Sequence, residues 1–287
     1  MTAVHSDRTY KLVPASRFST DELVDIYNAG RSDYLVAMSM DAEGLRKYLY
    51  TYDVDLDASV VVLDSEDYPA GIGMLGVRGD RGWITRLGII PERRQGGMGM
   101  SIMQSLIEAA RQSQARLIQL EVIQGNDAAH RLFQRCGFIE TRRLAVVERP
   151  AVALADDRTL LEVQIKQMSP DKLWECLAQR EPTESWVNEN ATLAKLDHLE
   201  GLHVTSADID GWIIYQRKAA ELGYVVLQGT KGDGEQTLVM LFHALHHFYP
   251  EHKTRIENVP VDEIWRKTLQ QFNYAEQFRR IEMHLNL

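Results

Sequence analysis

The sequence predicts an α/β protein made of two copies of one unit, each a sheet with helices on its faces. Three observations predict this class: an internal repeat, segments of alternating strand and helix character, and a length of 287 residues. A typical domain has about 100–200 residues, so this length accommodates two. The composition, 45% hydrophobic and 25% charged, provides apolar material for two cores.

The repeat is gapless at an offset of 136 residues. Leu120-Glu121 falls on Ile256-Glu257, and Asn126 falls on Asp262. CGFIETRR (136–143) falls on FNYAEQFR (272–279), with an aromatic residue, a glutamate and an arginine in register. We therefore expect two copies, at 8–150 and 158–287, joined near RPAVALADDR (149–158).

The elements of the first copy follow in order from apolar spacing and turn residues. YKLVPAS (10–16) predicts a strand, and STDELVDIYNAGRSDY (19–34) predicts a helix capped by Ser19 or Thr20. Three strands are then expected in ASVVVLDSED (58–67), AGIGMLGVRGD (70–80) and GWITRLGII (82–90). A glycine-rich turn and a helix follow, then strand RLIQLEVI (116–123), helix NDAAHRLFQRCG (126–137) and strand FIETRRLAVVE (138–148). Strands with helices between them predict a sheet covered on its faces.

The segment PERRQGGMGM (91–100) places three glycines immediately before a helix. Unpaired amides at a helix start point outward, and the helix dipole adds partial positive charge there. Glycines let the main chain approach an anion closely, and Arg93 and Arg94 are expected to add positive charge at the rim. The segment therefore predicts a phosphate site. The alternative is a turn cluster with no ligand.

Two segments resemble the Gcn5-related N-acetyltransferase (GNAT) family. IIPERRQGGMG (89–99) resembles its acetyl-CoA loop, Gln/Arg-x-x-Gly-x-Gly/Ala, with Arg94, Gly97 and Gly99 at the defining positions. LEVIQGNDAAHRLFQRCGF (120–138) resembles its second strand–helix block. The resemblance covers roughly residues 9–147, and the second copy more faintly. It implies two tandem GNAT-like domains, each a mixed, mostly antiparallel twisted sheet flanked by helices.

The resemblance also implies acetyl-CoA as co-substrate and a set of residues that contact it. The amides of Gln95, Gly96, Gly97, Met98 and Gly99 should hold the pyrophosphate, with Arg94 beside them. The main chain of Leu87, Gly88 and Ile89 should pair with the pantetheine arm, with Asn126 beside that arm. An extended ligand rich in amides can satisfy strand groups left open between two splayed strands.

Acetyl transfer needs a neutral amine, a polarised thioester carbonyl and a protonated leaving thiolate. Glu121 occupies the position where ribosomal-protein alanine acetyltransferases, members of the same family, carry a glutamate assigned as base. The alternative is a solvated glutamate at a strand end. The family's usual acid is a tyrosine, but Phe133 stands there and is expected to pack against the pantetheine sulfur. Solvent could protonate the thiolate, and other candidates are Tyr34, Tyr48, Tyr50 and Tyr52.

The second copy departs from the loop pattern. Asp233 and Glu235 replace Gly97 and Gly99, and two carboxylates would repel a pyrophosphate. The first copy is therefore expected to be catalytic, and the second is expected not to bind CoA. His243, His246 and His247 are expected to be core or solvated side chains, and no metal site is predicted.

Charge and cysteine content limit the partners. The net charge of −9 argues against a nucleic-acid binder, and no apolar run is long enough for a membrane span. Residues up to Pro150 carry 18 Lys/Arg against 20 Asp/Glu, and the remainder 14 against 21. The acidic second half gives a weak indication of cationic acceptors. Two separated cysteines indicate a reducing, cytoplasmic location.

The predicted function is an acetyl-CoA-dependent N-acetyltransferase. It would move an acetyl group to a primary amine of a small molecule or peptide by direct attack in a ternary complex. The alternative is a CoA-binding sensor or scaffold without turnover, because Phe133 cannot donate a proton. The chain is expected to be a monomer or a homodimer.

Overall fold

The computed structural model describes residues 10–36, 38–94, 96–154, 163–180 and 185–287. The chain divides into two compact units. Unit 1 runs to Arg142 and also contains Ile281–Leu287, while unit 2 is Arg143–Arg280. The sequence predicts two continuous segments, 8–150 and 158–287. In the structure the last seven residues, Ile281–Leu287, belong to unit 1 and not to unit 2. No helix in the described part of the chain is long and apolar enough to cross a membrane.

Unit 1 contains the strands and helices that the sequence predicts, in the predicted order, and one further helix at Ala42–Thr51. Its elements are β1 (Lys11–Pro14), η1 (Ala15–Arg17), α1 (Thr20–Ala29), α2 (Ala42–Thr51), β2 (Val54–Leu63), β3 (Pro69–Arg78), β4 (Arg81–Ile89), η2 (Pro91–Arg93), α3 (Met98–Gln112), β5 (Leu117–Ile123), α4 (Asp127–Arg135) and the start of β6 (Ile139–Arg149). Ser19 caps α1 by accepting from the Glu22 amide, and the Glu22 carboxylate accepts from the Ser19 amide in return. The reciprocal cap explains why the helix begins at Thr20.

The sheet of unit 1 is mostly antiparallel. Strands β1, β2, β3 and β4 pair antiparallel in chain order, and β5 joins β4 in parallel. The next position, beside β5, belongs to the end of β12 (Ala275–Asn286).

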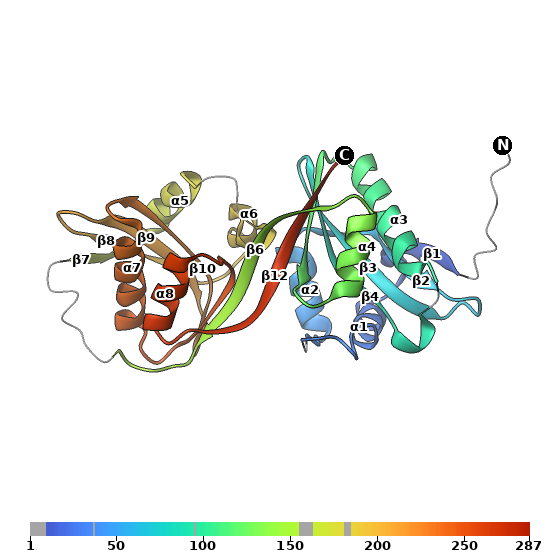
Figure 1. The fold of residues 1–287 in the computed structure, drawn as a ribbon, viewed down its shortest axis with the longest axis horizontal. Coiled ribbons are helices and arrows are strands. Elements are labelled where there is room, and N and C mark those ends of the chain that lie inside the picture. The colour runs from blue at the N-terminus through green and yellow to red at the C-terminus, as the bar shows by residue number, and fades with distance from the viewer. Residues whose placement is uncertain (1–9, 37, 95, 155–162, 181–184) are drawn as a thin grey trace. The chain divides into compact units, whose positions relative to one another are not determined.

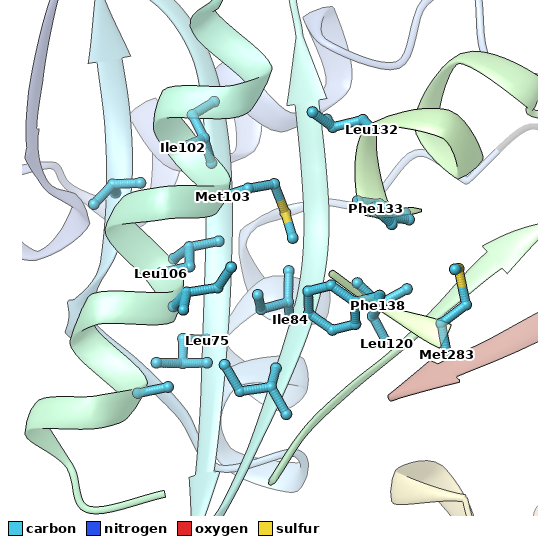
Figure 2. Packing of buried hydrophobic residues seen from close by; sticks show 14 of the residues in the cluster. Leu75, Ile84, Ile102, Met103, Leu106, Leu120, Leu132, Phe133, Phe138 and Met283 are labelled. Atoms are coloured by element: carbon cyan, nitrogen blue, oxygen red, sulfur yellow. The ribbon is translucent and has the colours of Figure 1, made fainter. Parts of the chain in front are cut away.

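Alternating side chains of β2 divide unit 1 into two cores. Val60 and Val62 pack with α3 and α4, whereas Val61 and Leu63 pack with α1 and α2. Because side chains in a strand alternate between faces, helices cover both faces of the sheet, as the ribbon shows (Figure 1). Figure 2 shows the larger core, where Met103 of α3 and Phe133 of α4 lie near Phe138.

Unit 2 contains the second set of elements. They are the remainder of β6, β7 (Gln164–Gln167), α5 (Pro170–Ala178), η4 (Trp186–Asn188), α6 (Asn190–Leu193), β8 (Leu199–Thr205), β9 (Asp210–Arg217), β10 (Glu221–Lys231), α7 (Gly234–Phe248), β11 (Lys253–Pro260), α8 (Glu263–Gln271) and the start of β12. Its strand order is β6-β11-β10-β9-β8-β7, antiparallel except for the parallel β10–β11 pair.

The predicted repeat is present in the structure. Helices α3 and α7 begin at Met98 and Gly234, and helices α4 and α8 begin at Asp127 and Glu263, each pair 136 residues apart. The structure therefore confirms the α/β class, with a mostly antiparallel sheet flanked by helices in each unit.

Two of the three histidines of α7 are core side chains, and the third, His247, is exposed. His243 and His246 are buried, and His246 hydrogen-bonds the Tyr274 hydroxyl at 3.0 Å. Burial lowers the pKa of His246 to about 3, so its ring is neutral.

The end of β12 is held in unit 1 by a buried carboxylate. Glu282 is 2% exposed and accepts from Arg142 Nε at 2.6 Å. The Thr141 hydroxyl donates to the Glu282 carbonyl at 3.1 Å, and Met283 lies in the core near Phe138 (Figure 2). The last strand segment is thus an integral part of the unit 1 core.

Candidate active site

Strands β4 and β5 separate partway along their length. Their parallel pairing covers only three positions and ends at Trp83 and Gln119. Beyond that point Leu87–Ile89 remains paired to β3 on its other side, through Ile72↔Gly88 and Gly71↔Ile89. The edge of β4 that faces β5 therefore has no strand partner here among the described residues.

A bulge in β4 starts this separation. The register with β3 shifts between Ile72 and Met74, and Arg86 opposite them has a φ of +53°. A positive φ is unusual for a residue with a side chain, and a bulge re-aims the strand and its side chains. The bulge directs Arg86 away from a regular strand position.

The start of α3 is open, as a phosphate site requires. Gly97 is the N-cap residue, with a φ of +92°, and no side chain caps the helix among the described residues. A Cβ at Gly96 would meet no atom within 4 Å. No described side chain therefore competes with an anion for the first turn of α3, where Gly96 and Gly97 are exposed. Gln95 lies outside the described residues.

The third glycine serves packing. A Cβ at Gly99 would lie 3.1 Å from Leu132 Cδ2, so glycine lets the first turn of α3 contact α4. Met98, the first residue of α3, is fully buried in the same core. The three glycines thus have separate roles: open space at Gly96, backbone geometry at Gly97 and close helix contact at Gly99.

The two arginines of the loop are not free positive charges. Arg93 pairs with Asp64 and lies over the Tyr68 ring, 5.1 Å from its centroid. Arg94 binds both carboxylate oxygens of Asp33, at 2.7 and 2.8 Å, and lowers the pKa of that carboxyl. The positive charge expected at the rim is therefore offset in part by Asp64 and Asp33.

Arg94 connects three parts of the site. Its Nε donates to the Ile89 carbonyl at 3.2 Å, while its guanidinium holds Asp33 in the segment after α1. The loop, the end of β4 and this segment are therefore held in one arrangement.

Asn126 and Phe133 lie on α4 and have structural roles. The Asn126 carbonyl oxygen caps α4 by accepting from the Ala129 amide at 3.2 Å, which leaves its NH₂ group as a donor. Phe133 is 6% exposed and packs against Phe138, with ring centroids 6.3 Å apart (Figure 2). A phenyl ring cannot supply a proton.

Glu121 lies on β5 and is not a solvated strand-end glutamate. Its Oε2 accepts a hydrogen bond from Trp83 Nε1 at 2.7 Å, and Trp83 is 4% exposed. The bond joins Trp83, at the last paired position of β4, to Glu121, two residues beyond the last paired position of β5. A charge-assisted bond of this length fixes the carboxylate in place.

Tyr48 joins this group from α2. Its hydroxyl is 2.6 Å from Thr85 Oγ1, and its ring lies 6.2 Å from the Trp83 ring. Burial raises the pKa of Tyr48, so its phenol stays protonated at neutral pH. Of the other candidate tyrosines, Tyr50 is 66% exposed and Tyr34 stacks with Arg31.

Several of these residues were not predicted from the sequence. No recurrent sequence motif contains Trp83, Arg31 or Arg86. Nothing in the sequence indicates that Asp33 pairs with Arg94. A tryptophan in a strand usually indicates core packing, and a positive φ at an arginine has no signature in one sequence.

The corresponding region of unit 2 is closed at the helix start. Asp233 replaces Gly97 and caps α7, its carboxylate accepting from the Gln236 amide at 3.0 Å. An amide that already has a carboxylate partner is not available to a phosphate, and the added negative charge would repel one.

The strands of unit 2 also separate, but their own chain fills the space. The β10–β11 pairing ends at Leu222 and Thr254, and η4 contacts both strands. Trp186 of η4 is fully buried, and Asn188 donates to the Glu257 carbonyl at 3.0 Å. Glu257, which corresponds to Glu121, is paired with Arg255 and Arg280. Although burial opposes it, these two arginines lower the pKa of Glu257.

Comparison with known proteins agrees with this geometry. Residues 22–138, which lie within unit 1, match the sequence model of the acetyltransferase (GNAT) family. A search of curated proteins finds no match.

Solved structures show the same fold over the whole chain. A GCN5-related N-acetyltransferase from Sphaerobacter thermophilus is 14% identical, with a TM-score of 0.67 over 98% of this chain and 96% of that one. A tandem GNAT protein from the clavulanic acid biosynthesis pathway is 12% identical, with a TM-score of 0.61 over 96% and 98%. A GCN5-related N-acetyltransferase from Kribbella flavida is 16% identical, with a TM-score of 0.56 over 100% and 73%. The chain thus has a tandem GNAT fold, and the match of residues 22–138 to the GNAT family model supports acyl transfer in general.

Proposed function

We propose that unit 1 is an acetyl-CoA-dependent N-acetyltransferase that acetylates a primary amine by direct attack in a ternary complex. One observation supports the proposal most directly. The start of α3 has no side-chain cap among the described residues, and it follows β4, whose edge toward β5 has no strand partner after Trp83. Helix amides suit a diphosphate, and an unpaired strand edge suits an extended chain of amides. Acetyl-CoA combines both features.

The residues that would hold acetyl-CoA follow from this arrangement. The amides of Gly96 to Gly99 would bind the pyrophosphate, and Leu87–Ile89 would pair with the pantetheine arm. Arg94 would keep the loop and the strand together through Asp33 and Ile89. The NH₂ group of Asn126 would donate toward the arm. Phe133 would line the apolar side of the site.

Glu121 would be the base. The carboxylate would take a proton from the ammonium group of the acceptor, directly or through one water. The neutral amine would then attack the thioester carbon, so that a C–N bond forms and the C–S bond breaks. As the C–S bond breaks, the nitrogen would release its second proton to solvent and the thiolate would take a proton from solvent, which is feasible because a thiol has a pKa of about 8.5. Trp83 would hold Glu121 in position for this transfer.

Unit 2 would not bind CoA. Its helix start is capped by Asp233, its separated strands are filled by η4, and its equivalent of the base is paired with two arginines. Each of the first two features opposes binding of CoA in unit 2, and the third opposes a role of Glu257 as base.

The test is release of CoA from acetyl-CoA with a panel of primary amines, together with the shift of the melting temperature by acetyl-CoA alone. We expect both a stabilisation and acceptor-dependent release. Stabilisation by acetyl-CoA without release from any acceptor would contradict the proposal and indicate a sensor or scaffold. Absence of stabilisation at millimolar acetyl-CoA would contradict the binding site itself.

A further inference from the structure

A tyrosine next to β1 lies beside the open start of α3. Tyr10 immediately precedes β1, and its hydroxyl oxygen is 2.8 Å from that of Ser101, the fourth residue of α3. A Cβ at Gly97, the N-cap residue, would lie 3.3 Å from the Tyr10 oxygen. The phenol is therefore close to the amides that the proposed function assigns to the diphosphate.

The register of β1 explains why this hydroxyl reaches α3. Lys11 pairs with Leu63 of β2, which fixes where the chain enters the sheet. Tyr10 and Leu12 pack against the larger core, to which α3 contributes, whereas Val13 packs against the core on the other face. Because side chains alternate between the faces of a strand, this register directs Tyr10 toward α3.

The two hydroxyls have one proton more than their mutual bond uses. Each carries one proton, and the bond between Tyr10 and Ser101 uses only one of the two. No other hydrogen bond of either hydroxyl occurs among the described residues. Ser101 is 5% exposed, and a buried donor needs an acceptor, so Ser101 is the better donor of the pair. The proton of the partly exposed phenol then remains for an acceptor at the helix start.

A neutral donor is useful here because the charges of the loop are offset in part. Arg93 is paired with Asp64, and Arg94 is paired with Asp33. A diphosphate at the start of α3 would therefore depend largely on main-chain N–H groups. A phenol next to those groups adds a donor without adding a charge, and its hydrogen bond to a phosphate oxygen would be of the strong, charge-assisted kind.

We propose that the Tyr10 hydroxyl donates a hydrogen bond to a diphosphate oxygen of acetyl-CoA, and that Ser101 orients the phenol by donating to it. Tyr10 is then a binding residue of the cofactor site, and Ser101 is a positioning residue that acts through it. This inference rests on the proposed function and adds a side chain to the main-chain amides of the phosphate site. It concerns only the phosphate end of the cofactor, and the base is not involved.

The experiment is calorimetric titration of acetyl-CoA into wild type and Tyr10→Phe, which removes the hydroxyl and keeps the ring. We expect the dissociation constant to rise about 10-fold or more, since hydrogen bonds to charged groups are the strong ones. Acetyl-3′-dephospho-CoA keeps the diphosphate but lacks the 3′-phosphate, so its dissociation constant should rise by the same factor. A loss confined to acetyl-CoA would overturn the inference, because the phenol would then contact the 3′-phosphate.

Two further outcomes separate this inference from the proposed function. If wild type binds both ligands and Tyr10→Phe binds them equally well, the inference is overturned and the proposed function stands. If wild type binds neither ligand, both are contradicted. Tyr249→Phe is the matched control, because Tyr249 lies in unit 2 and its hydroxyl donates to Glu200 at 2.9 Å. It should leave both affinities unchanged.

Ser101→Ala tests the positioning role. It keeps the phenol and removes its partner, so the dissociation constant of acetyl-CoA should rise less than in Tyr10→Phe. An equal rise in the two single variants would overturn the inference, because the hydroxyls would then only hold the first turns of α3. The double variant should bind no more weakly than Tyr10→Phe alone, since Ser101 acts through Tyr10. A further loss in the double variant would overturn the positioning role. Urea unfolding without ligand shows that each variant is folded.

Discussion

The indole nitrogen of Trp83, at the last paired position of β4, donates at 2.7 Å to the carboxylate of Glu121, two residues beyond the last paired residue of β5. The bond places an acidic group at the point where the two strands separate. A base at that point has access to whatever occupies the space between them.

Glu121→Gln should lower kcat by about 100-fold or more while leaving acetyl-CoA affinity unchanged, because an amide cannot accept the amine proton. The measurement is steady-state release of CoA together with a titration of acetyl-CoA. Glu108→Gln, an exposed glutamate of α3, is the matched control. Full activity of the Glu121 variant would show that another group accepts the proton.

Trp83→Phe should lower kcat less, by about 10-fold, because it removes one hydrogen bond to a charged group and retains an aromatic ring. The Glu121 carboxylate would then be present but no longer fixed. A double variant with Glu121→Gln should be no slower than Glu121→Gln alone, since the indole acts through the carboxylate. If the two losses in kcat were additive in the double variant, Trp83 would act independently of the Glu121 carboxylate.

Gly96→Asp should weaken acetyl-CoA binding by at least about 10-fold, because it brings a carboxylate close to the expected position of the pyrophosphate. The position has no positive φ and no atom within 4 Å of a Cβ, so the fold tolerates a side chain there. Gly96→Asn has nearly the same size without the charge and should bind almost normally. Calorimetric titration of both variants separates charge from bulk, and equal affinities would contradict the loop assignment.

The 287-residue chain should bind one acetyl-CoA. Asp233→Gly removes the cap of α7 but leaves η4 between β10 and β11, so it should not create a second site. Titration calorimetry of the wild-type chain and this variant measures the stoichiometry. Two sites in either protein would refute the assignment of unit 2 as a domain that does not bind CoA.

Glu282→Gln should lower the free energy of unfolding of unit 1 by about 1–3 kcal/mol at pH 7, because Arg142 loses a buried partner. Although burial opposes it, His284 and Arg142 lower the pKa of Glu282. A depressed carboxyl pKa stabilises the fold above its unfolded value of about 4.3, and the contribution disappears as pH falls through the folded value.

The difference between wild type and Glu282→Gln should therefore shrink below about pH 4. Urea unfolding at several pH values measures it. Glu276→Gln, in an exposed pair with Arg279, should change stability by less than about 1 kcal/mol at any pH. If the loss of unfolding free energy in the Glu282 variant did not depend on pH, it would come from packing and not from charge.

Much of the fold was predictable because it depends on local pattern. The alternation of Val60 to Leu63, the cap at Ser19 and the glycine at position 97 are short-range signals, each with a direct structural cause. The offset of 136 residues then predicted a second copy, whose helices begin at the expected positions.

The candidate site was predictable only in part. The open helix start and Glu121 follow from segments that are continuous in sequence. Tyr10, Tyr48 and Trp83 come from three separate segments, and their contacts within the site depend on how these segments pack. No short-range pattern encodes such a contact.

The sequence by itself determined that the chain contains two equivalent final strands, since 136–143 and 272–279 match in register. Only the tertiary structure decided which of them completes which sheet: β12 lies beside β5 in unit 1, and β6 pairs with β11 in unit 2. Equivalent strands offer nearly the same pattern of apolar side chains. The choice between them therefore depends on long-range contacts, such as those of Glu282 and Met283 in unit 1, and not on local propensity.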